Sequence, residues 1–257
     1  LCHPDKIGAT RRGRKCVNRE FPKSDVIVLD DAFQYRALRS WLNIVLVDYN
    51  RPIYKDRLLP FGRLRDLPSR TGVADIVITK CPAYMEDWER VQVVRAMGIR
   101  DFDPRTFTGV SRSGKRQKVY FTTINYCDLK PVYEEGDQRY IYSKKLILFS
   151  GIAKDTQLRR YLSDKYKIIK RFKFADHHKF TFLDIAKIRR ASEACPTAVI
   201  VTTEKDSQRI LDNKNIPESI RQRLFIVPIE VRFLSDSEKE DFDAALLDSL
   251  RSFHQDY

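Results

Sequence analysis

Residues 43–48 read NIVLVD, a short apolar run that is rich in β-branched residues and ends in an acidic one. Such a run is typical of a strand buried on both faces, as the strands of parallel sheets are. The same texture occurs upstream in VIVLD (Val26–Asp30) and downstream in DIVIT (Asp75–Thr79), and a helical pattern follows over Glu86–Met97. Short buried strands that alternate with helices predict an α/β fold with a parallel sheet.

This alternation is interrupted at Lys118. Val119–Tyr126 and Arg139–Ser143 flank the polar segment CDLKPVYEEGDQ, a pattern that predicts an antiparallel β-hairpin. We therefore expect a parallel-sheet domain over residues 1–117, a β-hairpin linker over 118–143 and a smaller α/β domain over 144–257. In the last part we expect strands at 146–150, 166–172, 198–202 and 225–229, and helices at 156–163, 183–193, 205–211 and 237–253.

Composition limits the classes of protein and of partner. The chain has 257 residues, of which 42% are apolar, enough for the cores of two ordinary domains. Its formal net charge of +13 indicates an anionic partner: a nucleotide, a phospholipid surface or a nucleic acid. The five cysteines are widely spaced and include no CxxC pair, so they support neither a disulfide framework nor a zinc site. No apolar run is long enough for a transmembrane helix, and no signal peptide is recognisable.

Two glycine pairs resemble a phosphate-binding loop only superficially. GVSRSGKR (Gly109–Arg116) has the GxxxxGK spacing, but Arg116 stands where Ser or Thr must hold Mg²⁺. A strand-like segment follows it, whereas a phosphate loop leads into the N-terminus of a helix. GATRRGRK (Gly8–Lys15) lacks both the correct Lys position and a preceding strand. We expect neither segment to bind phosphate.

The acidic pair Asp30–Asp31 directly follows the apolar run VIVL. Carboxylates at the carboxyl end of a parallel strand hold the Mg²⁺ of a nucleotide in phosphoryl-transfer folds. The alternative is that the two residues cap the element that follows. From the residues alone, both interpretations stay open.

A long basic loop, Tyr49–Thr71, separates the second and third expected strands. Loops of this length in a compact domain are usually functional, and the planar fork of arginine suits phosphate oxygens. A solvated basic loop is the alternative. The charged residues in question are Arg51, Arg57, Arg63, Arg65 and Asp66.

Two further motifs lie in the second half of the chain. Asp176, His177 and His178 follow an expected strand, where an Asp–His pair can carry or tune a proton. A surface turn is the alternative. TTEKD (Thr202–Asp206) lies at a strand-to-helix junction, where Thr203 or Asp206 can simply cap the helix.

Taken in order, six motifs resemble those of the tetraacyldisaccharide 4′-kinase family, over essentially the whole chain from Val26 onward and in the style of its Bacteroidetes branch. The resemblance implies a P-loop kinase domain joined to a smaller α/β domain by a two-stranded linker. It also implies ATP-dependent phosphorylation of the 4′-hydroxyl of a tetraacyldisaccharide 1-phosphate in lipid A biosynthesis, with Mg²⁺. The motifs are DDAFQYR (Asp30–Arg36), LLPFGRLRD (Leu58–Asp66), ADIVITKCP (Ala74–Pro82), SGIAK (Ser150–Lys154), FADHH (Phe174–His178) and TTEKD.

The same resemblance implies roles for individual residues around the nucleotide. Asp30 and Asp31 match the Walker B acidic pair, which would hold Mg²⁺ and contact ATP. Gln34 and Arg36 match adjacent positions that face the active-site cleft, and we expect both to be cofactor-binding.

Further matches concern the reaction itself. Arg65 and Asp66 match an Arg–Glu pair of the family, so that Arg65, with Asp31, would be catalytic and Asp66 would lie on the cofactor side. His177 matches the histidine thought to assist deprotonation of the 4′-hydroxyl. The chain departs from the family at four positions: Tyr35 replaces a usual His, Asp66 a usual Glu, Phe61 a usual Ala and Ala32 a common Gly.

The family's Walker A loop, its catalytic aspartate and its membrane-associated N-terminal helix correspond to a region upstream of Leu1. We therefore expect residues 1–117 to be the C-terminal part of the kinase domain, and the chain by itself to be inactive for lack of Walker A. The resemblance implies a peripheral protein at the cytoplasmic face of the bacterial inner membrane. Its partners would be a lipid A disaccharide precursor, ATP and an anionic membrane surface.

Two rival functions remain. Nucleic-acid binding would suit the charge, but no helix-turn-helix, RRM or zinc pattern is present and the basic residues are spread along the chain, so we expect no nucleic-acid partner. The other is a catalytically inactive basic α/β module that docks an anionic partner, either nucleic acid or membrane. In that case the acidic pair, the loop arginines and His177 would not converge in space.

Overall fold

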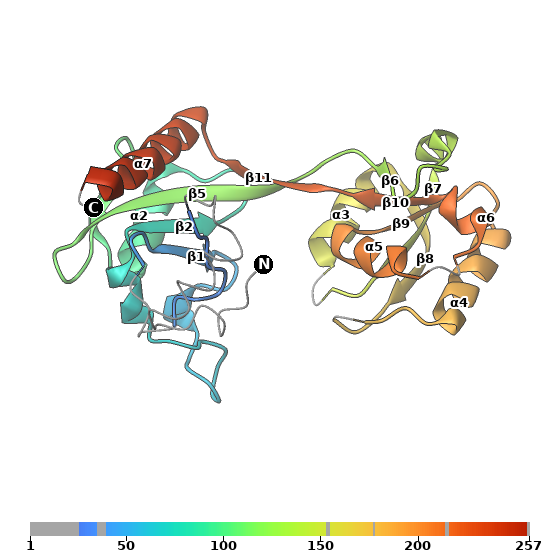
Figure 1. Cartoon of the computed structure of the whole chain (residues 1–257), viewed down its shortest axis with the longest axis horizontal. Coiled ribbons are helices and arrows are strands. Elements are labelled where there is room, and N and C mark those ends of the chain that lie inside the picture. The colour runs from blue at the N-terminus through green and yellow to red at the C-terminus, as the bar shows by residue number, and fades with distance from the viewer. Residues whose placement is uncertain (1–25, 35–39, 153–154, 177, 214–215, 256–257) are drawn as a thin grey trace. The chain divides into compact units, whose positions relative to one another are not determined.

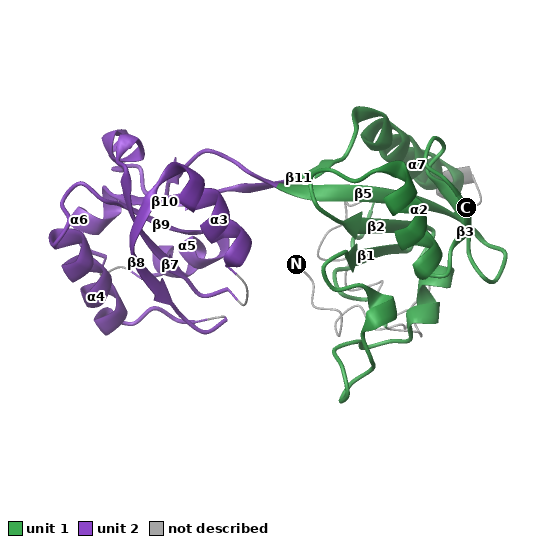
Figure 2. Ribbon diagram, turned by 180° about the vertical axis from the view of Figure 1, so that it is seen from behind, with its two compact units in different colours: residues 1–124, 231–257 green, residues 125–230 purple. Residues whose placement is uncertain are grey.

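The computed structural model in Figure 1 describes residues 26–34, 40–152, 155–176, 178–213 and 216–255. The chain forms two compact units, residues 1–124 with 231–257 and residues 125–230, which are coloured separately in Figure 2. Each unit has its own sheet, and each sheet contains parallel strands. The predicted α/β class is therefore confirmed.

The first sheet has the strand order β1-β2-β5-β4-β3, with β11 also paired to β5. The strands β1, β2 and β5 run parallel, and β4 and β3 continue the sheet in antiparallel fashion. The predicted strands at 43–48 and 75–79 are confirmed to within one residue. The strands are β1 (Ile44–Asp48), β2 (Ile76–Lys80), β3 (Arg100–Asp103), β4 (Thr108–Val110), β5 (Arg116–Tyr126) and β11 (Ile229–Phe233).

Helices cover both faces of β5. On one face, Phe121 packs in a cluster with Val93 and Val94 of α2 (Asp87–Ala96). On the other, Tyr120 meets the ring of Phe242 from α7 (Asp236–Gln255) edge-on, with the ring centroids 5.4 Å apart. The C-terminal helix therefore completes the first unit.

Polar contacts fasten α7 to β5. The fully buried carboxylate of Glu238 accepts a hydrogen bond from the backbone N–H of Phe121. The carboxylate of Asp241 accepts hydrogen bonds from Lys118 Nζ and from the Tyr120 hydroxyl, each at 2.7 Å. These contacts join segments more than a hundred residues apart in the chain.

The second sheet has the order β6-β10-β9-β7-β8, in which only β6 is antiparallel. All four strands and the first three helices predicted for this region are confirmed to within two residues. The strands are β6 (Lys130–Pro131), β7 (Lys145–Ser150), β8 (Lys167–Lys173), β9 (Val199–Thr203) and β10 (Leu224–Val227). The helices are α3 (Thr156–Lys165), α4 (Phe182–Glu193), α5 (Glu204–Leu211) and α6 (Glu218–Arg221).

Alternation along β7 shows how this sheet is covered. Leu146 and Leu148 pack with Leu158 of α3, whereas Phe149 packs with Ile185 of α4 on the opposite face. Because successive side chains of a strand point to opposite faces, an apolar run such as LILF requires a helix on each side. The second unit is accordingly a three-layer α/β sandwich.

The predicted strand at Val26–Asp30 is wrong. Residues 26–29 have no regular secondary structure, and Val26, Ile27 and Val28 are 50%, 44% and 84% exposed. A β-branched run becomes a strand only where a neighbouring strand satisfies its backbone N–H and C=O groups. Within the described part of the chain, the sheet ends at β1 and no strand pairs with residues 26–30.

The predicted β-hairpin is wrong in its second strand. Residues 119–126 do lie in β5, but the partners of β5 are β2, β4 and β11. Gln138–Tyr142 forms the 3₁₀ helix η4, whose first turn is capped by the Asp137 carboxylate accepting from the Arg139 N–H. The two-stranded element is therefore made by β5 with β11, which is distant in sequence.

The division of the chain also differs from the expected one. Residues 231–257 belong with the first unit rather than with residues 144–230, and the first unit extends to Ile124 rather than ending at 117. The reason is packing: the buried Glu238 and the half-buried Phe242 of α7 pack against β5, which no periodicity within α7 could indicate.

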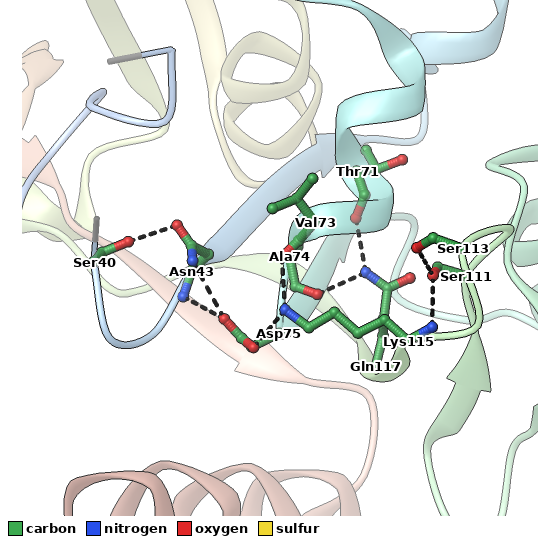
Figure 3. A network of polar contacts seen from close by, with 10 residues as sticks. All are labelled: Ser40, Asn43, Thr71, Val73, Ala74, Asp75, Ser111, Ser113, Lys115 and Gln117. Atoms are coloured by element: carbon green, nitrogen blue, oxygen red, sulfur yellow. Dashed lines mark hydrogen bonds and ion pairs between the residues drawn. The ribbon is translucent and has the colours of Figure 1, made fainter. Parts of the chain in front are cut away.

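The segment Gly109–Arg116 is confirmed not to be a phosphate loop. It forms the turn between β4 and β5, so a strand follows it where a phosphate loop needs a helix. Lys115 Nζ donates to the Val73 carbonyl and pairs with Asp75, both at 2.7 Å. Figure 3 shows this network. This network lies at the amino ends of the parallel strands, whereas ligands of such sheets bind at the carboxyl ends. Gly8–Lys15 lies outside the described residues.

The buried carboxylate of Glu238 leads to a test of how α7 is attached. Replacing it in E238A leaves the Phe121 N–H without its acceptor, which should lower the free energy of unfolding by about 1–3 kcal/mol. E238Q retains an acceptor oxygen and should cost less than E238A. Chemical denaturation of both variants measures this, with E240Q on the same helix as a control expected to stay within about 0.5 kcal/mol of the wild type.

The pH dependence provides a second readout of the same group. Burial raises the pKa of Glu238 above its ordinary value of 4.5, despite hydrogen bonds and Arg90 that oppose the shift. The folded state therefore disfavours the ionised form, and the stabilising contribution of Glu238 declines as the pH rises above that value. Relative to the wild type, E238Q should gain stability as the pH rises from about 4.5. A constant difference across the pH range would contradict this.

Candidate active site

The acidic motif and the basic loop meet at Asp31 and Arg65. Arg65 Nη1 lies 2.5 Å from Asp31 Oδ2, and the two side chains are 60% and 62% exposed. The two residues are 34 positions apart, so the contact joins DDAFQYR to LLPFGRLRD. Asp31 has a positive φ of 52°, a left-handed conformation that Asp adopts more readily than most residues.

A second contact joins the acidic motif to a later part of the basic loop. The guanidinium of Arg70 lies over the ring of Phe33, 5.4 Å from its centroid. Asp66 holds Arg70 from the side, because its Oδ2 accepts from Arg70 Nε at 3.3 Å while Oδ1 accepts from the Leu67 N–H. The Asp66 carboxylate is thus used at the start of η3 (Pro68–Val73).

The side chains of Asp30 and Gln34 have no polar partner among the described residues. Asp30 is exposed and Gln34 half-buried, and neither side chain forms a hydrogen bond or ion pair with another described residue. No group of three or more His, Cys, Asp or Glu side chains in that part of the chain could hold a metal by itself. An exposed carboxylate pair still suits Mg²⁺, which usually takes one or two carboxylates together with substrate phosphates and water. Arg36 lies outside the described residues.

The basic loop leaves β1 at the carboxyl edge of the sheet. Asp48, the last residue of β1, pairs with Lys80 of β2 at 3.1 Å and accepts a hydrogen bond from the Asn50 N–H. Ile53 packs against the core beneath the loop. A pocket of about 440 Å³ lies within the loop, lined by Arg51, Lys55, Asp56 and Arg63 among others.

In the second unit, three motifs converge at the carboxyl ends of parallel strands. The Gly151 N–H, after β7, donates to Asp206 Oδ2 at 2.8 Å. A Cβ at Gly151 would lie only 3.1 Å from Asp206 Oδ1 and from the Ala175 carbonyl oxygen, and 3.5 Å from His178 Cβ. The absence of a side chain at residue 151 therefore lets SGIAK, FADHH and TTEKD pack together.

Asp206 and Thr203 cap α5, as one of the sequence interpretations proposed. The Thr203 hydroxyl accepts from the Asp206 N–H at 3.1 Å and donates to its carboxylate at 2.7 Å. Arg209 pairs with the same carboxylate at 3.0 Å, and Asp206 is fully buried. This carboxylate therefore organises the edge of the sheet.

His178 has a structural partner. Its Nε2 lies 2.9 Å from Asp184 Oδ2, and its ring stacks on Phe174 with centroids 4.7 Å apart. Asp184 also closes the capping box of α4 with Thr181. Burial would raise the pKa of Asp184, but hydrogen bonds from His178 and Thr181 outweigh it and hold that pKa below its usual range. His177 lies outside the described residues.

Sequence reasoning missed one buried ion pair at this edge. Arg171 donates from Nε and Nη2 to the two oxygens of Asp155, each at 3.0 Å, and Asp155 is only 3% exposed. The only sequence feature that pointed to this ion pair was Asp155 itself, which directly follows SGIAK. Its partner on β8 could not be found from the sequence, because strand neighbours are set by the fold.

Known proteins resemble this chain over most of its length. The family model described as "LpxK: Tetraacyldisaccharide-1-P 4'-kinase" matches residues 7–251. A tetraacyldisaccharide 4′-kinase of Phocaeicola vulgatus is 35% identical over 92% of this chain, and one of Parabacteroides distasonis is 34% identical over 86%. A crystal structure of LpxK from Aquifex aeolicus in complex with ATP covers 90% of this chain with a TM-score of 0.56 and 22% identity, a likeness of fold.

The chain spans about 60% of the length of the proteins it matches. It covers 62% of the Phocaeicola vulgatus protein, 58% of the Parabacteroides distasonis protein and 59% of the Aquifex aeolicus chain.

Asp206 allows a test of how the second-unit motifs are held together. D206N replaces one acceptor oxygen with a donor that faces other donors, and it removes the negative charge that Asp206 presents to Arg209. We expect a loss of about 3 kcal/mol in the free energy of unfolding, typical of breaking a buried pair. D176N is the matched control, because the Lys205–Asp176 pair is exposed and loosely spaced at 3.4 Å, and it should cost less than about 1 kcal/mol. Equal losses in the two variants would contradict the assignment.

Proposed function

Because the chain belongs to the tetraacyldisaccharide 4′-kinase family, we propose that the whole protein transfers the γ-phosphoryl group of ATP to the 4′-hydroxyl of a tetraacyldisaccharide 1-phosphate in lipid A biosynthesis. The observation that supports this most directly is the Asp31–Arg65 ion pair. It brings a carboxylate and a guanidinium from two distant motifs together, and such a pair suits the charges of phosphoryl transfer.

We assign the nucleotide side of the site to the acidic motif. Asp30 and Asp31 would hold Mg²⁺ together with phosphate oxygens, and bound Mg²⁺ neutralises the charge that develops on the phosphates. Gln34, Arg36 and Asp66 complete this side of the site. In the present structure Asp31 is engaged by Arg65, so binding requires Asp31 to exchange that partner for the cation.

Arg65 and His177 have the catalytic roles in this proposal. Once released from Asp31, the planar guanidinium of Arg65 can donate two parallel hydrogen bonds to the transferred phosphoryl group. His177 removes the proton from the 4′-hydroxyl as it attacks. The next residue in the sequence, His178, is held by Asp184 and Phe174.

The location proposed for the protein follows from its substrate. A tetraacylated disaccharide resides in a membrane, so we propose a peripheral association with an anionic membrane surface, at the cytoplasmic face of the inner membrane. The net charge of +13 supports an electrostatic contribution. In the described part of the chain, no helix combines the length and the apolar character needed to cross a bilayer.

The first test concerns the acidic pair. In a protein of the length of the full relatives, D31N should lower kcat by roughly 10²–10³-fold, the usual effect of losing one charge-stabilising group. D101N is a matched control, because Asp101 is also exposed and has a positive φ of 53°. Phosphorylation of the disaccharide with ATP and Mg²⁺ is the measurement. Equal activities of D31N and D101N would contradict the proposal.

The 257-residue chain should not phosphorylate the disaccharide by itself. Within its described residues, no glycine-rich loop leads from a strand into a helix, and Lys115 is held at the opposite end of the sheet. Phosphoryl transfer depends on such a loop and its Lys to position the phosphates. Appreciable activity of the chain alone in the same assay would show that the phosphate-binding group lies within it.

The second test concerns proton transfer. H177A should lower kcat by roughly 10²–10⁴-fold and remove the acidic limb of the pH–rate profile, while leaving the free energy of unfolding unchanged. H178A should instead destabilise the fold, because it removes the hydrogen bond to Asp184 and the ring contact with Phe174. Unchanged turnover in H177A would contradict a catalytic role for His177.

A further inference from the structure

The loop between β1 and β2 carries an exposed apolar apex, Leu58–Phe61. Leu59 is 62% exposed, and Phe61, at 86%, is the most exposed of the large apolar side chains among the described residues. Leaving side chains of this size in water forgoes about 1.5–3 kcal/mol each relative to burial. The apolar apex therefore calls for a partner that covers it.

Backbone hydrogen bonds hold the apolar apex in this position. The Leu59 N–H donates to the Leu64 carbonyl and the Leu64 N–H to the Arg57 carbonyl, both at 3.0 Å, and the Gly62 N–H donates to the Leu58 carbonyl. A Cβ at Gly62 would lie 2.1 Å from the Arg57 carbonyl oxygen, so only glycine allows so tight a turn. The tight turn therefore holds the side chains of Leu59 and Phe61 in exposed positions.

A basic pocket lies in the same loop, lined by Arg51, Lys55, Asp56 and Arg63. Three cations face one carboxylate, which leaves a charge of 3 − 1 = +2. The Asp56 oxygens already accept from the Arg51 side chain and from the N–H groups of Arg57 and Arg63. These hydrogen bonds, the one from the Arg57 N–H first, keep the pKa of Asp56 below its usual range, so its charge persists.

Two cations of the basic pocket remain available to an anion. The side chains of Lys55 and Arg63 are exposed, and within the described part of the chain they form no hydrogen bond or ion pair. Both belong to the loop that carries the apolar apex, and Arg63 directly follows Gly62 in its tight turn. The loop therefore combines outward apolar groups with unneutralised positive charge.

We propose that the apolar apex and the basic pocket form the element that contacts the membrane: Leu59 and Phe61 enter the acyl-chain region of an anionic leaflet while Lys55 and Arg63 meet lipid phosphates. Anionic headgroups and acyl chains occur together at a lipid surface, which matches the two halves of the loop. The inference rests on the proposed function, in which the substrate is itself a membrane lipid. It places this contact on the loop that also carries Arg65.

The first experiment measures cosedimentation of the 257-residue chain with vesicles of equimolar phosphatidylglycerol and phosphatidylcholine, without ATP. F61A should weaken binding roughly tenfold, since each 1.4 kcal/mol of lost burial is a factor of ten. Y142A is the matched control, because Tyr142 is 85% exposed in the other unit, and it should bind like the wild type. Equal loss in both variants would overturn the proposal.

A charge variant separates the basic pocket from the overall net charge. K55Q/R63Q should weaken binding roughly 30-fold at low salt, from about 1 kcal/mol per basic residue near the surface. K187Q/R190Q removes the same charge from the exposed face of α4 and should have little effect. Binding that is equal for vesicles of phosphatidylcholine alone, or weakened equally by both double variants, would argue against the pocket.

Two controls identify the source of the phosphate and the depth of insertion. Inorganic phosphate should release the wild type from vesicles no better than sulfate at equal ionic strength; specific release by phosphate would indicate a site for the free ion and overturn the proposal. In F61W the new indole should shift its emission to the blue on anionic vesicles, whereas that of Y142W should not. An absent shift in F61W would overturn insertion even if F61A failed to fold.

These outcomes are separable from those of the kinase assay. Vesicle binding requires neither ATP nor the acidic pair, so D31N should bind vesicles like the wild type. Loss of apex-dependent binding with intact phosphorylation would refute the loop's role alone, and the converse would refute the enzymatic assignment alone.

Discussion

Tyr120 and Phe121 are neighbours on β5, both are fully buried, and they point to opposite faces of the first sheet. A strand with this pattern needs an apolar cover on each side. The chain supplies one cover locally, with α2 between β2 and β3, and the other from its C-terminal end, with α7. The return of the chain after the second unit, and the pairing of β11 with β5, follow from this requirement.

The two units use carboxylates in contrasting ways. Asp206 and Asp155 are buried, and each is satisfied by several donors, so they stiffen the edge of the second sheet. Asp31 and Arg65 are more than half exposed, and an exposed ion pair contributes little to stability. Its partners can therefore exchange at low cost in free energy, which suits groups that must take up a cation and a phosphoryl group.

The part of the basic loop from Tyr49 to Asp66 combines contacts to the core and to the candidate site with an exposed, positively charged surface. It begins at the carboxyl edge of β1, rests on the core through Ile53, and ends at Arg65 beside Asp31. Between these anchors it exposes Phe61 and concentrates positive charge. Its first end is fixed by the sheet, and Arg65 brings its other part next to Asp31 without a strong bond between the two.

Much of this protein could be predicted from local sequence. Apolar runs such as LILFS and AVIVT predicted β7 and β9, and helical periodicity located α2, α4 and α7 to within two residues. The order of the motifs identified the family. Arg116 stands where a phosphate loop has a Ser or Thr hydroxyl, and a strand follows Lys115, so both features excluded a phosphate loop at Gly109–Arg116. These signals act within a few residues, through strand alternation, helical periodicity and capping.

Only the tertiary structure decided where those elements pair and pack. VIVL has the composition of a buried strand, but it lies exposed because no described strand pairs with it. The helix Asp236–Gln255 was predicted to within two residues. That it belongs to the first unit could not be predicted, because this depends on the hydrogen bond from the Phe121 N–H to Glu238, 117 residues away. The sequence by itself determined the local elements and the family, since both depend on patterns within short segments. Strand partners, burial and the Asp31–Arg65 contact were decided by the fold, because each depends on residues that only folding brings together.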